Sequence, residues 1–270
     1  MCLTFAFRML LVAALLLLAA SACGQEKGEL QEKRRLAMTM RAGTVKLHYQ
    51  GMPERVSPVL MKAPVLKTND ATRGEVDGAL WLWLDGQRPV AAMCITYYDS
   101  GKWNYENVTL TDEALALSGR PGWVWEPKAA PRNWTALDDA VPDAPRARQL
   151  ALRSLPRQFE ISEVRRGERF PLRLIGQPIY SYADPDEGVT DAALFAASYG
   201  TNPEVLVQVE ARLEGNQRRW HVAFARLTAA EATVKLGDKE LWKVAPISVG
   251  EYDMHEGYYA TNEPDRPEPD

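Results

Sequence analysis

Two stretches of this chain decide its fold: GEVDGALWLWLDG at residues 74–86 and GVTDAALFAASYG at residues 188–200. They lie 114 positions apart and carry the same Gly, Asp, Ala, Leu and Gly at matching places. Each is a mostly apolar run of strand length between two glycines, which are typical of turns. At this offset Arg34–Gly101 aligns without a gap to Arg148–Gly215, with 15 identities in 68 pairs, where unrelated sequences give roughly four.

The alignment continues beyond Gly101 after a three-residue insertion in the second copy, at an offset of 117 positions. Trp103 then matches Trp220, and Trp125 matches Trp242. The chain is therefore expected to be a tandem of two duplicated modules, at residues 30–128 and 144–247. Residues 129–143, which include two prolines, are expected to form the linker between them.

Each module begins with an amphipathic helix pattern, at Leu30–Arg41 and at Ala144–Leu155. Runs of strand type follow in the same order: 44–49, 59–66, 79–84, 90–98 and 103–110 in the first module, and 158–164, 172–182, 193–199, 205–213 and 220–227 in the second. Short turns join successive runs, so the strands pair antiparallel, because parallel pairing needs a crossover of about a dozen residues. The expected fold class is α+β, with each module a short helix packed on a curved antiparallel β-sheet.

The N-terminus has the pattern of an export signal. Arg8 is the only charged residue among the first 22, and an unbroken apolar run of twelve follows at residues 9–20. A membrane-spanning helix needs roughly 20 apolar residues, so residues 1–22 are interpreted as a signal peptide. Ala20-Ser21-Ala22 precedes Cys23-Gly24 as in a bacterial lipobox, although Leu is more common than Ala at the position of Ala20.

Two interpretations of the mature N-terminus stay open. The first is a lipoprotein, anchored to a membrane in the periplasm or at the cell surface through a lipid on Cys23, with residues 23–29 as a tether. The second is a soluble periplasmic or secreted protein.

Composition and charge exclude several function classes. The chain has 270 residues, of which 46% are hydrophobic and 25% charged, as is typical of a globular protein. A net charge of −4 and an isoelectric point near 5.6 argue against a nucleic-acid partner, because such proteins are usually basic. Residues 248–270 hold seven Asp and Glu, one Arg and three prolines, so this acidic tail is expected to be disordered.

Aromatic residues of the first module form a candidate ligand-binding site. Six of the eight tryptophans fall between positions 81 and 134, several of them spaced by two residues, which places both rings on one face of a sheet. Such rings can form a platform for a sugar ring or an extended peptide; the candidate residues are Trp81, Trp83, Trp103, Tyr105, Trp123 and Trp125. The alternative is a buried core face or an interface between modules, which Leu80, Leu82 and Leu84 on the opposite strand face favour.

The sequence carries few signs of metal or cofactor chemistry. The three histidines form no HxH or HExxH pattern and the three cysteines no CxxC pattern, so neither a metal nor a cofactor is expected. The acidic loop Asp184–Asp191 could bind calcium, but the matching loop of the first module keeps only Asp70, Gly74 and Asp77, which favours turn and capping roles.

Two kinds of residue are candidates for catalysis. Cys94 lies between Met93 and Ile95 in a strand, so it is interpreted as a buried apolar residue rather than a nucleophile. Carboxylates such as Asp77, Asp191 and Glu210 could form the acidic pair of a glycosidase-like enzyme, which needs only two carboxylates at a suitable separation.

Several segments resemble the signature of a family of uncharacterised exported bacterial proteins: Asp191–Phe195, Gly200–Glu204, Trp220, Ala225–Thr228, Asp77–Trp81 and Trp125–Pro127. The resemblance spans most of the mature chain and implies neither an activity nor a catalytic residue. The expected function is therefore a cell-envelope binding or structural protein of unknown ligand; a polysaccharide or a peptide is a ligand that the aromatic platform would accept. The alternative is an envelope hydrolase that acts on a polysaccharide or a peptide.

Overall fold

The fold comes from a computed structural model, which describes residues 28–70, 74–119, 123–248 and 250–264. The expected signal peptide, residues 1–22, and the expected lipid anchor Cys23 lie outside the described residues. Among the residues that are described, no helix has both the length and the apolar character needed to span a membrane.

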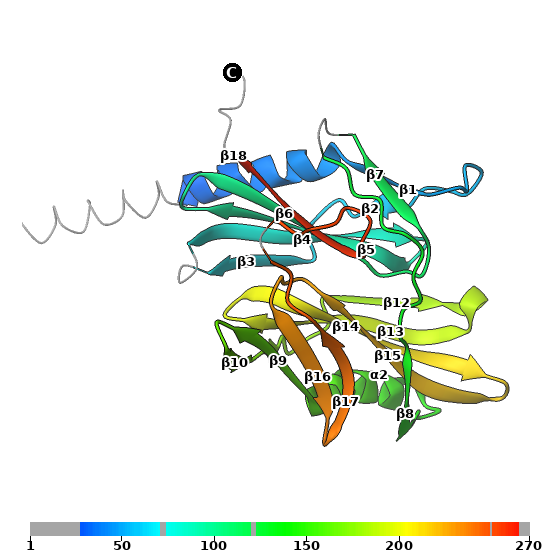
Figure 1. The fold of residues 1–270 in the computed structure, drawn as a ribbon. Coiled ribbons are helices and arrows are strands. Elements are labelled where there is room, and N and C mark those ends of the chain that lie inside the picture. The colour runs from blue at the N-terminus through cyan, green and yellow to red at the C-terminus, as the bar shows by residue number, and fades with distance from the viewer. Residues whose placement is uncertain (1–27, 71–73, 120–122, 249, 265–270) are drawn as a thin grey trace, which may run out of the picture.

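Two six-stranded antiparallel sheets form the centre of the molecule (Figure 1). The first sheet has the order β18 (Tyr258–Pro264), β6 (Lys102–Thr109), β5 (Arg88–Tyr98), β4 (Glu75–Asp85) and β2 (Val59–Leu60), and β3 (Leu66–Asp70) also pairs with β4. The second sheet has the order β8 (Thr135–Ala140), β15 (Gln217–Arg226), β14 (Asn202–Glu214), β13 (Val189–Tyr199) and β11 (Arg173–Leu174), and β12 (Tyr180–Asp184) also pairs with β13. Strands of the N-terminal half, residues 28–128, therefore pair in the same order as those of the C-terminal half, residues 144–247.

The turns that join the long strands lie where the two glycine-bounded stretches end. Gly86 connects β4 to β5, and Gly200 connects β13 to β14. Their φ angles are +58° and +65°, in the left-handed region that only glycine adopts at little cost.

Helices and smaller sheets cover the outer faces of the two large sheets. Residues 28–43 are helical and lie over the first sheet, whereas α2 (Pro145–Ser154) and the 3₁₀ helix η2 (Leu155–Gln158) lie over the second (Figure 1). A short 3₁₀ helix, η3 (Pro185–Glu187), follows β12. The small sheets pair β1 (Lys46–Tyr49) with β7 (Leu115–Ser118), and β9 (Phe159–Arg165) with β10 (Glu168–Pro171) and β16 (Glu231–Leu236), which also pairs with β17 (Lys239–Val244).

Alternate residues of the long strands build separate cores. Trp81 and Trp83 of β4 pack with Met38 of the N-terminal helix in a first core. Phe195 of β13 packs with Leu152 of α2 in a second core. The opposite faces of the two sheets meet in a third core, formed by Leu80, Leu82, Ala92, Cys94, Leu194 and Leu206 among others, so the two halves are joined by an apolar interface.

The expected α+β class with antiparallel sheets is confirmed, and strand dominates over helix. Residues 129–143, which the sequence predicts to be the linker, contain β8, which pairs with the outer edge of β15. Leu137 explains the difference, since its side chain is buried against the second core. The two prolines, Pro131 and Pro142, flank the strand rather than interrupt it.

The prediction of a disordered tail at residues 248–270 is wrong for its described part. Residues 258–264 form β18, which pairs with β6 along its whole length and completes the first sheet. Tyr258 and Ala260 are buried in the core between the sheets. Glu263 is paired with Arg41 of the N-terminal helix, so the acidic composition is partly neutralised there. Residues 265–270 lie outside the described part of the chain.

Candidate functional site

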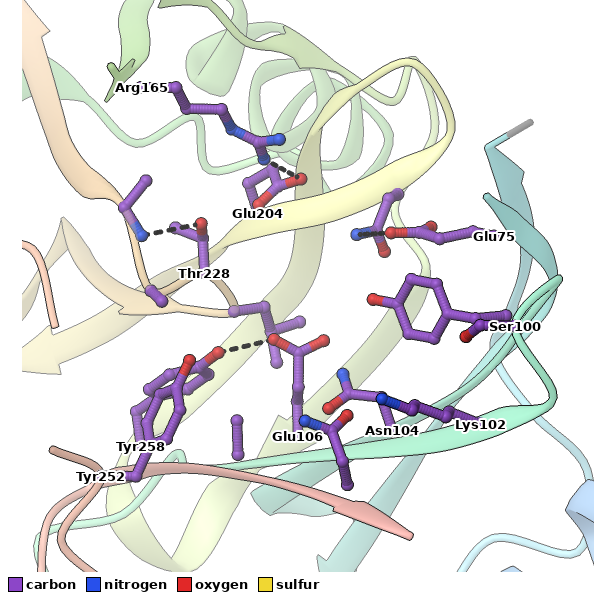
Figure 2. Close-up of a pocket in the computed structure, with 17 residues that line it drawn as sticks. Glu75, Ser100, Lys102, Asn104, Glu106, Arg165, Glu204, Thr228, Tyr252 and Tyr258 are labelled. Carbon is purple, nitrogen blue, oxygen red and sulfur yellow. Dashed lines mark hydrogen bonds and ion pairs between the residues drawn. The ribbon is translucent and has the colours of Figure 1, made fainter. Parts of the chain in front are cut away.

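A cavity of about 580 Å³ opens between the two sheets at one end of their interface. Its walls come from both halves of the chain: the start of β4, the strands β6 and β18, the start of β14 and the segment that follows β15 (Figure 2). Three carboxylates line it, those of Glu75, Glu106 and Glu204. Apart from these, its polar side chains include Asn104, Asn202 and Asn262.

Strand alternation places Glu106 in this cavity. Its neighbour Tyr105 points into the first core, so Glu106 points to the opposite face of β6, toward the second sheet. The hydroxyl of Tyr258 on the adjacent strand donates a hydrogen bond of 2.5 Å to Oε1 of Glu106 (Figure 2). Glu106 is therefore held by a neutral donor across the β6–β18 pair.

Glu75 and Glu204 face the same cavity from the two other strands. The side-chain amide of Asn202 donates to Oε1 of Glu75 at 3.1 Å, which ties the two halves together. Arg165 of β9 donates from Nη2 to Oε1 of Glu204 at 2.9 Å, and its Nε also lies 2.6 Å from Glu163. Glu75 and Glu204 are only 3% and 2% exposed, so both carboxylates lie deep in the wall.

The three carboxylates also influence one buried thiol, that of Cys94. Its thiol is fully buried in the core between the sheets, as the sequence predicts for a structural cysteine. Burial raises the pKa of the Cys94 thiol well above its usual value, and the charges of Glu106, Glu75 and Glu204 raise this pKa further. A thiol with so high a pKa stays protonated at neutral pH and is a poor nucleophile.

Two tyrosines border the cavity near Glu106. Burial raises the pKa of Tyr258 well above its ordinary value, and the charge of Glu106 adds to this shift. Burial and then Glu106 also raise the pKa of Tyr252. Both hydroxyls are therefore neutral at physiological pH, and their rings give the cavity an aromatic side.

The six aromatic residues predicted as a ligand platform lie elsewhere, in the first core. Each side chain is at most 4% exposed, so no ring face is open to a ligand. The prediction of a platform is therefore wrong, and the alternative, a buried core face, is confirmed for Trp81, Trp83, Trp103, Tyr105, Trp123 and Trp125. The physical reason is the helix of residues 28–43 together with β1 and β7, which cover this face of the sheet.

The carboxylates predicted for a hydrolase do not converge either. Asp77 accepts hydrogen bonds from Gln31 and Arg34 of the N-terminal helix, at 3.0 and 3.3 Å. Asp191 is paired in the same way with Arg148 and Gln149 of α2. Both aspartates are buried and hold a helix on a sheet, and neither lines the cavity with the three glutamates.

Glu210 lies at the opposite end of the interface, fully buried. It accepts hydrogen bonds from Arg88 at 2.9 Å, from Arg212 at 2.6 Å and from the hydroxyl of Tyr182 at 2.6 Å. Two guanidinium groups and a hydroxyl thus satisfy this carboxylate, so it is a structural centre of the interface rather than an available acid.

The acidic loop Asp184–Asp191 makes structural contacts as well. Asp184 pairs with Arg88 at 3.2 Å, and Asp191 holds α2. Within the described ranges, no group of three or more His, Cys, Asp or Glu side chains has an arrangement that could hold a metal ion.

Sequence reasoning missed Glu75, Glu106 and Glu204, although a signal was present. In the alignment of the two halves, Glu75, Glu106 and Glu204 match Val189, Ala223 and Val90. Each cavity carboxylate is therefore aligned with an apolar residue of the other half. Asp77 and Asp191, by contrast, are identical and structural. This contrast narrows the candidates without singling out the cavity, because Asp99, Asp112 and Glu113 also match apolar residues and do not line it.

No protein-family model, curated protein or solved structure matches this chain. The resemblance to a family of uncharacterised exported bacterial proteins therefore stays a prediction.

Proposed function

We propose that this chain is a non-enzymatic binding protein of the bacterial cell envelope, and that its ligand presents an ammonium or guanidinium group to the cavity of Glu75, Glu106 and Glu204. The observation that carries the proposal is the gathering of these three carboxylates from β4, β6 and β14 around one space of about 580 Å³. Carboxylates in a partly dry cavity bind a cation more strongly than the same groups do in water.

The charge balance of the cavity supports a cationic ligand. Arg165 compensates Glu204, with which it pairs directly. The Asn202 amide and the Tyr258 hydroxyl, which are neutral, donate to Glu75 and Glu106, and over the whole lining three carboxylates stand against two cationic side chains, Lys102 and Arg165. Tyr252, whose ring contacts that of Tyr258, also lines the cavity, and an aromatic ring attracts a cation.

The runner-up is an envelope hydrolase. A cavity with several carboxylates is the observation that favours it, because glycoside hydrolysis needs an acid and a base on either side of the scissile bond. Binding is preferred because Glu204 is neutralised by Arg165 and Glu106 accepts a short hydrogen bond from Tyr258, so neither is presented as a free acid or nucleophile.

Calorimetric titration with spermidine tests the proposed site. Glu106→Gln and Glu75→Gln each remove one charge with little change of shape, and each is expected to weaken spermidine binding about tenfold, which corresponds to roughly 1.4 kcal/mol. Asp238→Asn is the matched control, because Asp238 is exposed in the turn between β16 and β17, and its binding constant should equal that of the wild type. Binding that is equal in all four proteins would contradict the proposal.

A second measurement separates binding from hydrolysis. The protein is incubated with purified cell-wall polysaccharide, and the release of reducing ends is followed. A binding protein releases none, whereas turnover that Glu106→Gln abolishes would support the hydrolase.

We further propose that the chain is exported and anchored through a lipid on Cys23, on the strength of the apolar run at residues 9–20 and the Ala-Ser-Ala-Cys sequence. Phase partition in a mild detergent tests this: the wild type should enter the detergent phase, and Cys23→Ser should stay in the aqueous phase. Partition of both proteins into the aqueous phase would favour the soluble periplasmic or secreted form.

We also propose that the two halves arose by duplication of one α+β module. The matching strand orders support this, as does the matching of helix anchors, with Arg34 and Asp77 aligned to Arg148 and Asp191. An experimental structure in which β4, β5 and β6 fail to superpose on β13, β14 and β15 would remove that support.

A further inference from the structure

A second cavity, of about 490 Å³, lies between the halves near the end of β6. Its inner wall is apolar: Phe224 of β15 is buried, and Trp242 and Val244 of β17 and Ile247 stand half-buried beside it. Its acidic residues, Glu251, Asp253 and Glu256, are exposed and therefore stand at the mouth. The interior of this cavity suits an apolar chain or ring.

Arg132 lines the same cavity and has unused hydrogen-bonding capacity. Its Nη1 donates to the carbonyl oxygen of Thr109 at 3.0 Å. Its Nε and Nη2 are buried, and within the described part of the chain they have no hydrogen-bond partner. A buried donor without a partner loses its hydration without compensation, so a ligand that supplies an acceptor is favoured there.

These two nitrogens form one edge of the guanidinium group. Their N–H bonds point the same way and match the two oxygens of a carboxylate, which is the strongest pairing that arginine makes. Burial lowers the pKa of Arg132 to about 10, so the group is desolvated but still protonated at neutral pH. An anion in this position would therefore meet a poorly hydrated positive charge, on which Asp112 and Glu210 also act.

We propose that this cavity binds an amphiphilic carboxylate, with its apolar body against Phe224 and Trp242 and its carboxylate in the fork of Arg132 Nε and Nη2. The proposal is independent of the acidic cavity, which lies on other residues except for Tyr258.

A neighbouring polar cavity also borders Arg132, together with Arg55, Arg88, Arg212 and Trp134. There Arg55 pairs with Asp85, and Arg88 and Arg212 pair with Glu210. The charges of these three arginines are compensated, whereas Arg132 has two buried donors without a partner. The apolar wall that would contact the ligand lines the cavity that contains Trp242.

Titration with decanoate, decanol and decylammonium, followed by tryptophan fluorescence and calorimetry, tests the proposal in the intact protein. Decanoate is expected to bind at least tenfold more tightly than the other two. Arg132→Met keeps the apolar stem and removes the fork, so decanoate should fall to the affinity of decanol. Equal binding of decanoate and decanol to the wild type would overturn the proposal.

Variants of two tryptophans test where the apolar chain of decanoate lies. Trp242→Ala should weaken decanoate about tenfold, whereas Trp134→Phe, which keeps an aromatic ring beside the Arg132 guanidinium, should leave the affinity unchanged. The reverse result would place the ligand in the polar cavity and overturn the assignment. If Arg132→Met fails to fold, Arg132→Lys retains the charge with a single donor group, and decanoate should then bind more weakly than to the wild type but more tightly than decanol.

Discussion

Asp77 and Asp191 show how single residues fix the architecture. They are identical positions of the two halves, and each accepts hydrogen bonds from a helix that packs on the outer face of its sheet. Their aspartate–arginine pairs are the same in both halves, Arg34 with Asp77 and Arg148 with Asp191. An acid that both halves retain is thus explained by packing, so it gives no reason to expect catalysis.

Removing either carboxylate should destabilise the protein. Asp191→Asn should cost roughly 3–5 kcal/mol of unfolding free energy, because it leaves the buried Arg148 with backbone carbonyl partners but without its carboxylate. Asp77→Asn should cost less, about 2–3 kcal/mol, because Arg34 is 21% exposed and can be rehydrated. Urea unfolding measures both, and an Asp77 variant less stable than the Asp191 variant would contradict this ranking.

Trp83 is another single residue that tests the architecture, because its burial decides whether this strand face is a ligand platform or part of a core. It is 1% exposed, and truncation leaves a large cavity, so Trp83→Ala should lower the unfolding free energy by roughly 3–5 kcal/mol. Val59→Ala is the control: its side chain is 66% exposed, and its effect should stay within about 0.5 kcal/mol. A Trp83→Ala protein as stable as wild type would be incompatible with the first core.

Among the strands, β8 and β18 have the same structural role, although they lie in different parts of the chain. Each adds an outer strand to a large sheet, β8 beside β15 and β18 beside β6. An unpaired outer strand exposes a row of backbone groups that other chains can join, and these two segments cover it. The C-terminal segment therefore closes the sheet of the N-terminal half, which ties the two ends of the described chain together.

Substitution of the two adjacent tyrosines of β18 measures how much this strand contributes to stability. Tyr258 is 4% exposed in the core between the sheets, so Tyr258→Ala should cost roughly 3–5 kcal/mol and reduce the hydrogen-exchange protection of the β6 amides. Tyr259, on the opposite face, is half-buried, and Tyr259→Ala should cost clearly less. Equal effects of the two changes would show that β18 is not oriented as described.

The sequence allowed prediction of the elements where local pattern and packing agree. Both helices, the long strands and the turns at Gly86 and Gly200 follow from periodicity and turn chemistry. The predicted strands at 59–66 and 172–182 are each two short strands, because a break separates β2 from β3 and β11 from β12. β8 and β18 were missed because composition predicted loops, whereas a free sheet edge and buried side chains, which no local pattern contains, made them strands.

On the scale of the whole molecule, the interface between the sheets is apolar in the middle and polar at both ends. Alternate residues of β14 show this directly: Glu204 lines the acidic cavity, Leu206 packs in the core, and Glu210 binds the arginines at the far end. The candidate cavity could not be predicted from either half alone, because its carboxylates come from strands of both and converge only when the halves pack together. The core face of the tryptophans could be predicted, because it depends on one sheet and its own helix.

Both polar ends use a tyrosine that donates to a glutamate, Tyr258 to Glu106 and Tyr182 to Glu210. Burial, followed by the charge of the paired glutamate, raises the pKa of each tyrosine well above its ordinary value. In the unfolded chain a tyrosine loses its proton near pH 10, whereas these two keep it in the folded protein, so above that pH the folded state binds more protons. Their contribution to stability is complete below about pH 10 and decreases as the pH rises toward the folded values.

The unfolding free energy should therefore fall above about pH 10, by up to roughly 1.4 kcal/mol per pH unit for each tyrosine. The double variant Tyr258→Phe, Tyr182→Phe should be less stable than wild type at pH 8, because two glutamates lose a donor, yet its stability should fall less steeply between pH 10 and 11. Urea unfolding at a series of pH values measures both slopes. Parallel slopes for the wild type and the double variant would mean that the two tyrosines do not couple the interface to pH.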